Sequence, residues 1–155
     1  MTIIFSEKII NLLKSDNIAS QQGMVEMFDN HVGASTVLMP YGGKYQLTEE
    51  EASVQKVPVL GKESNTASIM TFGYNPFISE WSPFHGAAYA VVESISKVVA
   101  VGGKWQGIRF SFQEYFERTQ NNPTRWGKPF SALLGALKAQ LELGCAAIGG
   151  KDSMS

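Results

Sequence analysis

Apolar residues recur at helical spacing in three stretches of the chain. Residues 6–13 begin with a serine and predict a short amphipathic helix. Ser82 and Pro83 open a second helix, because a serine side chain caps free amides and proline at the first helical position loses no hydrogen bond. This helix is expected to run to about Val101, where two glycines follow. A third helix is expected over 130–143, with the leucine stripe Leu133, Leu134, Leu137 and Leu141.

Runs rich in β-branched and aromatic residues predict strands between these helices. They cover 32–38, 57–60, 66–72, 108–112 and 145–148. Residues 41–56 hold glycines and clustered glutamates with little periodicity, so they are expected to form a surface loop. Residues 113–129 are expected to form an aromatic, charged loop or a broken helix. This order favours an α/β or α+β layer with helices packed on one face of a sheet.

The composition adds an unusual feature to this picture. Among 155 residues, 44% are apolar and only 17% are charged, against a usual charged share of about a quarter. The chain also holds nine phenylalanines, five tyrosines, three tryptophans and fifteen glycines. This mixture is too apolar for a small domain that is exposed on all sides.

Charge and cysteine content exclude several classes of protein. Thirteen basic and fourteen acidic residues give a net charge of −1, which favours neither nucleic acid nor an anionic membrane as a partner. The single cysteine, Cys145, excludes an internal disulfide framework and fits the reducing cytoplasm. It is expected to be an inert core residue. One cysteine and two histidines also argue against a zinc site, and the first residues are too short an apolar run for a signal or anchor.

The segment Gly149-Gly150-Lys151-Asp152-Ser153 is the strongest local candidate for chemistry. Glycines let backbone amides approach phosphate oxygens, and a lysine adds a cation. The spacing does not match a Walker motif, because Asp152 stands where serine or threonine belongs. The segment is therefore either a phosphate-binding loop or a strand-ending turn with a solvated lysine.

Other candidate residues have ordinary structural alternatives. Glu93 is expected on the long helix, where it could bind a metal or form a salt bridge with Lys97 four residues later. His85 is either a base or a polar residue of the first helical turn, and His31 is similarly ambiguous. The aromatic and basic residues of 109–126 either stack a base or pack in a core or subunit interface.

Several longer strings resemble a known enzyme family. SPFHGAAYAVVESISKVVAVGG, IRFSFQEYF, NNPTRWGKPFSALLGALKAQ and above all IGGKDSMS look like phosphoribosylformylglycinamidine synthase. That enzyme uses ATP and glutamine-derived ammonia to amidate formylglycinamide ribonucleotide in purine biosynthesis. The resemblance covers nearly the whole chain and is to the amino-terminal part of the second aminoimidazole-ribonucleotide-synthetase-like unit of the long form.

The resemblance implies a fold and a set of partners. The fold is α/β (α+β), with a mainly antiparallel sheet of about four strands and helices on one face. Residues 1–155 are expected to be a single domain of a longer multidomain synthase, cut within the GGKDSMS motif. Its partners would be the remaining domains, including the first synthetase half and the glutaminase, and the isolated piece could pair with a second copy.

The resemblance also assigns expected roles to the glycine-rich segment. In short forms of the enzyme a Gly-Gly-Asn-x-Ser turn contacts the nucleotide, magnesium and the ribonucleotide. The matching residues predict nucleotide or phosphate contacts from Gly149, Gly150 and Lys151, and a substrate contact from Ser153. Because a charged lysine cannot ligate magnesium, Lys151 is expected to contact phosphate instead. ATP and magnesium are cofactors of the full enzyme, and none is assigned to this chain alone.

Some long forms hold a second, structural nucleotide with magnesium in this half. Glu93 matches one metal ligand, but Lys97 stands in place of an asparagine. Gly61 lies near the place of an aspartate, and Gln21 near that of a lysine. We therefore expect this auxiliary site to be lost and Glu93 to pair with Lys97.

No catalytic residue is assigned, because the family's catalytic histidine belongs to the first half. Neither His31 nor His85 inherits that role, and the chain alone is expected to be inactive. Two roles remain open for the chain. It is either a part of the ligase whose glycine-rich segment lines an active site made jointly with the missing half, or a structural half with a degenerate nucleotide site. A more distant alternative is a relative with the same fold, such as a thiamine-phosphate kinase or selenophosphate synthetase.

Overall fold

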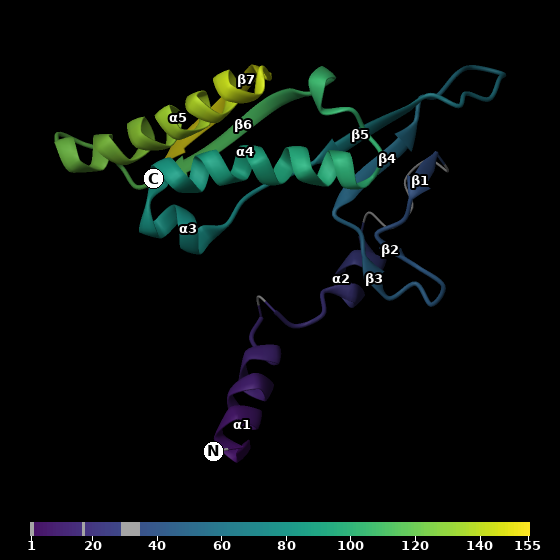
Figure 1. Ribbon diagram of the computed structural model, residues 1–155, viewed down its shortest axis with the longest axis horizontal. Coiled ribbons are helices and arrows are strands. Elements are labelled where there is room, and N and C mark those ends of the chain that lie inside the picture. Colours follow the sequence, from purple (N-terminus) through teal and green to yellow (C-terminus); the bar gives the residue numbers. More distant parts are fainter. Residues whose placement is uncertain (1, 17, 29–34) are drawn as a thin grey trace.

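The computed structural model describes residues 2–16, 18–28 and 35–155 (Figure 1). The elements in chain order are α1 (Thr2–Leu13), α2 (Gln22–Met27), β1 (Thr36–Leu38), β2 (Tyr41–Gly42), β3 (Thr48–Glu49), β4 (Ala52–Lys56), β5 (Ala67–Thr71), α3 (Pro76–Trp81), α4 (Pro83–Ala100), the 3-10 turn η1 (Trp105–Gly107), β6 (Arg109–Phe116), α5 (Pro123–Leu143) and β7 (Ala146–Met154). The predicted strand over 32–38 is described only from residue 35, and His31 lies outside the described residues.

Three strands form an antiparallel sheet in the order β1, β4, β5. The predicted strand over 66–72 is confirmed as β5. The predicted surface loop over 41–56 is wrong, because it contains β2, β3 and β4. Apolar and polar residues alternate within β4, and Val54 is buried. The neighbouring glutamates obscured this pattern in the sequence. The predicted strand over 57–60 is also wrong, since this segment begins the turn from β4 to β5.

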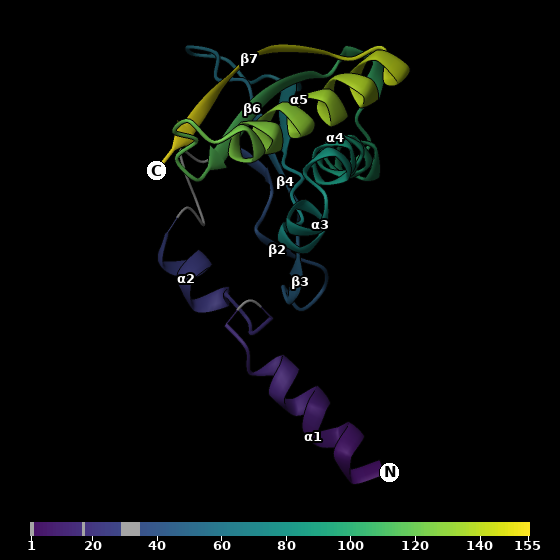
Figure 2. The same ribbon diagram turned by 90° about the vertical axis from the view of Figure 1, so that its left-hand side faces the viewer.

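A second sheet consists of β6 and β7, which run parallel and are connected through α5 (Figure 2). The expected loop or broken helix over 113–129 is only partly correct: β6 continues to Phe116, the loop is confined to residues 117–122, and α5 begins at Pro123. Asn122 caps this helix: its side-chain oxygen accepts hydrogen bonds from the amides of Thr124 and Arg125. Cap and proline together set the start of α5 seven residues before the predicted one.

Helices α4 and α5 pack closely and form the core with β6. The core residues are Val91, Ile95, Phe110, Ala136, Ala139 and Cys145. The expected helix over 82–101 and the buried position of Cys145 are confirmed. On α5, however, the leucine stripe is exposed and small residues are buried. A Cβ on Gly135 would lie 1.9 Å from the carbonyl oxygen of Phe84, so only glycine allows this approach.

These elements confirm the predicted fold class, a mixed α/β fold with an antiparallel sheet and helices. Helix α1 extends away from the body in both views (Figures 1 and 2). None of the helices in the described residues is long and apolar enough to cross a membrane.

The accessible surface is large for the size of the chain. It measures 11916 Å², whereas a compact monomer of this mass exposes roughly 7,700 Å². Many large apolar side chains contribute to this surface, among them Phe72, Phe77, Trp81 and Leu141. The apolar composition therefore does not correspond to an oversized core, and much of it lies on the surface.

Candidate functional site

The glycine-rich segment lies within strand β7 and does not form a turn. The expected strand end at residue 148 is wrong, because β7 pairs with β6 up to Met154. A register shift near Ile148 precedes the paired glycines. A Cβ on Gly150 would lie 2.7 Å from the carbonyl oxygen of Phe112, so glycine permits the two strands to approach here. An extended strand does not gather successive amides around one point, as a phosphate-binding nest does.

Lys151 and Ser153 come together on this strand. They are two residues apart and therefore share one face, where the ammonium of Lys151 donates a hydrogen bond to the hydroxyl of Ser153. Their register partners on β6 are Gln113 and Tyr115, both exposed. The arrangement is a polar strip in which the exposed ammonium of Lys151 lies beside the hydroxyl of the half-buried Ser153, which suits an anionic group.

The other face of the same strands carries two neighbouring carboxylates. Glu114 and Asp152 are register partners. Burial, followed by the negative charge of Asp152, raises the pKa of the Glu114 carboxyl. The two faces thus differ in charge, and only the face with Lys151 offers a cation.

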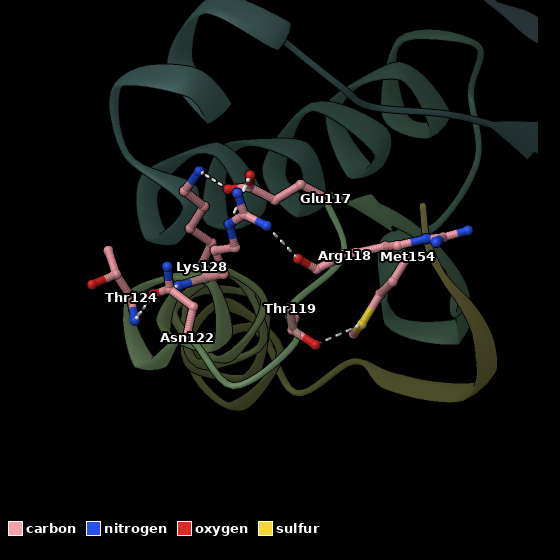
Figure 3. A network of polar contacts seen from close by, with 8 residues as sticks. Glu117, Arg118, Thr119, Asn122, Thr124, Lys128 and Met154 are labelled. Carbon is pink, nitrogen blue, oxygen red and sulfur yellow. Dashed lines mark hydrogen bonds and ion pairs between the residues drawn. The ribbon is translucent and has the colours of Figure 1, made fainter.

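A polar network holds the ends of β6 and β7 against the start of α5 (Figure 3). Glu117 accepts a hydrogen bond from Lys128, and its other carboxylate oxygen lies 3.3 Å from Nε of Arg125. The hydrogen bond from Lys128 lowers the pKa of Glu117, with burial opposing it and the charges of Lys128 and Arg125 adding to it. The guanidinium of Arg125 also donates to the carbonyl of Arg118 at 3.0 Å.

The same region connects directly to the end of β7. The Thr119 hydroxyl is buried and lies 3.9 Å from the sulfur of Met154, and the Arg118 amide donates to the carbonyl of Ser155 at 3.2 Å. These contacts position the strand that carries Ser153. Sequence reasoning missed Thr119 because its partner Met154 is 35 positions away. It missed Glu117 because the start of α5 was predicted too late to bring Arg125 and Lys128 beside it, although the Asn-Pro helix start was a usable signal.

The predicted pairing of Glu93 with Lys97 is confirmed. The Lys97 ammonium lies 2.8 Å from Oε1 of Glu93 and 3.0 Å from Oε2 of Glu51. It also lies 4.4 Å from the ring centre of Phe72. Burial alone would lower the pKa of Lys97, but its hydrogen bonds and the charges of the two glutamates raise it. Lys97 is therefore charged, and it connects α4 to the start of β4 and the end of β5.

This arrangement does not fit a divalent cation at Glu93, because an ammonium occupies the space beside the carboxylate and would repel the metal. The other two positions of the expected auxiliary site lie elsewhere. Gly61 is in the turn after β4, whereas Glu51 precedes that strand. The Gln21 side chain donates to the carbonyls of Asp16 and Ala19. Within residues 2–16, 18–28 and 35–155, no three histidines, cysteines or acidic residues lie close enough to hold a metal.

His85 has a structural position at the start of α4. Its Nδ1 lies 2.8 Å from the hydroxyl of Ser82, the capping residue of this helix. Its ring also contacts the rings of Trp81 and Phe84. These contacts correspond to the polar first-turn residue, one of the two alternatives that the sequence left open.

An α/β domain with an extended Gly-Gly-Lys-Asp-Ser strand matches curated relatives of one kind, although no family model matches the chain. Over 149 residues it is 30% identical to the phosphoribosylformylglycinamidine synthase subunit PurL of Pyrobaculum aerophilum, covering 96% of this chain and 20% of that protein. The PurL subunit of Methanobrevibacter smithii is 30% identical over 96 residues, or 62% of this chain and 12% of the relative. The PurL subunit of Caldivirga maquilingensis is 28% identical over 106 residues, which cover 66% of this chain and 13% of the relative.

The similarity to PurL suggests an aminoimidazole-ribonucleotide-synthetase-like fold, with which the mixed α/β arrangement agrees. The resemblance to phosphoribosylformylglycinamidine synthase is confirmed: the chain fits a fragment of the PurL subunit. It spans a fifth or less of the length of these relatives.

Proposed function

We propose that this chain functions as one part of a phosphoribosylformylglycinamidine synthase. The full ligase would convert formylglycinamide ribonucleotide and glutamine-derived ammonia to the amidine in purine biosynthesis, with ATP and magnesium as cofactors. The observation that carries this proposal is the similarity to a PurL subunit over 96% of the chain. As a fragment, the chain would work as a single domain in the cytoplasm within a larger assembly.

One contribution of the chain would be structural. Its accessible surface of 11916 Å² exceeds that of a compact monomer of its mass by roughly half. Surface of this kind is usually covered by a partner. The other domains of the synthase, including its first synthetase half and glutaminase, would cover it, or a second copy of the chain would.

The other contribution would be substrate binding by the polar strip on β7. Lys151, which is exposed, and Ser153, which is half-buried, both offer hydrogen-bond donors on one face of the strand. Ser153 would contact the ribonucleotide, and Lys151 a phosphate group. Because the segment is extended, Gly149 and Gly150 would contribute close approach of the backbone to a nucleotide, without forming a phosphate-binding loop.

Steady-state kinetics of the assembled synthase tests the substrate contact. Ser153→Ala should raise KM for the ribonucleotide about fivefold with little change in kcat, because one hydrogen bond contributes about 1 kcal/mol. Ser96→Ala is the matched control, since its hydroxyl is exposed and bonds only to the carbonyl of Val92 in its own helix. Unchanged KM in the Ser153 variant would contradict the contact.

A purely structural role is the second candidate, and the ion pairs of Lys97 favour it. The ammonium of Lys97 lies beside the carboxylate of Glu93, and a metal site would need that carboxylate to be free. Under this alternative, Ser153→Ala would leave the kinetics unchanged while surface substitutions impair assembly. In either case the chain alone, mixed with ribonucleotide, ATP and ammonium, should give no amidation. Measurable product would refute this expectation.

A further inference from the structure

Helix α5 has its large apolar side chains on the outside of the molecule and its small residues in the core. The buried residues of this helix are Pro129, Ala132, Gly135, Ala136 and Ala139. At 3.6 residues per turn, the opposite side carries four large side chains that are 61%, 41%, 45% and 73% exposed, namely Phe130, Leu134, Leu137 and Leu141. We call these four residues the leucine face. Figure 1 shows α5 on the outer side of α4.

A shallow groove follows the leucine face beside the start of α4. It has a volume of about 470 Å³ and is mainly apolar. Its lining residues are Phe84 of α4 and, on α5, Leu134, Leu137, Lys138, Leu141 and Glu142. The leucine face is therefore hollowed along one edge, as a surface that receives the side chains of another element would be.

The charged side chains of α5 are all paired within the chain. Lys138 and Glu142, which line the groove, form an ion pair with each other. The other two charged residues of the helix, Arg125 and Lys128, both pair with Glu117. A partner on the leucine face therefore meets apolar surface whose neighbouring charges are already neutralised, and it needs to supply apolar side chains and no counter-charge.

The spacing of the leucine face indicates that this partner is a helix. Its successive residues are four, three and four positions apart. This is the spacing of the apolar seam of a coiled coil, in which side chains of one helix insert between those of the other. The sequence of spacings is also the same when it is read backwards. An antiparallel copy of α5 therefore presents its own four side chains in matching register.

We propose that the leucine face of one copy of this chain packs against the leucine face of a second copy, with the two α5 helices antiparallel about a two-fold axis. Phe130 would lie against Leu141 of the second copy, and Leu134 against Leu137. The two-fold axis forms each of these contacts twice. This interface does not use the β1–β4–β5 sheet.

A second α5 fits this face better than the other exposed apolar helix, α1. Phe5, Ile9 and Leu12 of α1 are exposed and have the first two of the three spacings. The fourth position, however, is Asp16, which lies beyond the end of that helix and would place a carboxylate on apolar surface. The surface available to a second copy is also sufficient. The chain exposes about 4,000 Å² more than a compact monomer, and a stable interface buries about 1,200–2,000 Å² in total.

Sedimentation velocity of the 155-residue chain over a concentration series tests the proposal, and it measures association independently of ligase activity. We expect a monomer–dimer equilibrium whose dissociation constant rises at least tenfold in Leu137→Glu. Glutamate is a good helix former, so this change adds a charge without disfavouring the helix. Leu47→Glu, at an exposed leucine between β2 and β3, is the matched control and should leave the equilibrium unchanged. Equal melting temperatures of the variants would show that folding is unaffected.

Three results of the same experiment overturn the proposal. The chain stays monomeric, or it forms a dimer that is insensitive to Leu137→Glu, or the dimer is weakened by Ile9→Glu in α1 as strongly as by Leu137→Glu. The last result would assign the leucine face to α1 of a second copy.

Cross-linking tests the orientation of the two helices. In the antiparallel pair Phe130 meets Leu141 of the second copy, whereas two Phe130 positions are roughly 16 Å apart along the helix axis, because each residue rises about 1.5 Å. A mixture of Phe130→Cys and Leu141→Cys chains should therefore form a covalent dimer on oxidation faster than either chain alone. Cys145 is buried and present in every sample. Rapid cross-linking of Phe130→Cys alone would show parallel helices, and either that result or no enhancement in the mixture would contradict the antiparallel contact.

Discussion

The Lys97 ammonium lies 2.8 Å from the carboxylate of Glu93, one helical turn earlier on α4. The same ammonium reaches Glu51 from outside the helix, at 3.0 Å. A local i,i+4 pair is thereby extended into a junction between a helix and the sheet. The positive charge between the two carboxylates is therefore supplied by the side chain of Lys97.

The chain should therefore not bind ADP in a magnesium-dependent manner at Glu93. A metal at this carboxylate would lie beside the ammonium and would have to displace it. Isothermal titration calorimetry with ADP, with and without magnesium, measures this directly. Heat that depends on magnesium and disappears in Glu93→Ala would show that the auxiliary site is intact.

Removing the charge of Lys97 should lower the free energy of unfolding by about 1–2 kcal/mol, because its side chain is only 13% exposed and holds two carboxylates. Lys97→Met keeps the apolar stem and so isolates the charge. Lys138→Met is the control. Its pair with Glu142 has the same i,i+4 spacing but is exposed, and should contribute only about 0.3–0.5 kcal/mol. Urea denaturation compares the two, and equal losses would contradict a special role of Lys97.

Two glycines of α5 should respond to alanine in opposite directions. At Gly135 the new Cβ would meet the carbonyl oxygen of Phe84 at 1.9 Å, so Gly135→Ala should destabilise the protein by about 1–3 kcal/mol or more. Gly127 has nothing within 4 Å. Gly127→Ala should stabilise the helix by up to about 1 kcal/mol. Thermal unfolding of both variants tests this, and the same sign in both would disprove the close helix crossing.

Local signals predicted the parts of the fold that depend on neighbouring residues. Ser82 and Pro83 located the start of α4, and the spacing of Glu93 and Lys97 predicted their ion pair. Non-local contacts decided what the sequence could not predict. Periodicity on α5 identified the leucines, but the close approach at Gly135 buried the small residues instead.

At the candidate site, too, local signals were predictive and non-local contacts were not foreseen. The sequence located Lys151 and Ser153 together, and the structure keeps them on one face. Two glycines before a lysine indicated a turn. Only pairing with β6, a strand more than thirty residues away, makes this segment extended. Glu51 could not be assigned to Lys97 in advance, because forty-six positions separate them.

Acid should weaken the network that holds α5 to β6, and Glu117 is the group responsible. The hydrogen bond from Lys128 lowers the pKa of Glu117 below its ordinary value of 4.5. Its ionised form therefore stabilises the folded state above that value, and the contribution is lost as the pH falls through the lower folded pKa. Glu117→Gln should reduce stability at neutral pH and flatten the loss in acid. Denaturation curves over a pH series measure both effects.

Glu114 supplies a control of opposite sign on the same strand. Burial and then Asp152 raise its pKa, so its ionised form is penalised in the folded state at neutral pH. Glu114→Gln should therefore preserve or increase stability near neutral pH, and its advantage should shrink as the pH falls through the raised pKa of the wild-type carboxyl. If both glutamine variants shifted the pH profile in the same direction, the contrast between the ion-paired Glu117 and the Glu114–Asp152 pair would be incorrect.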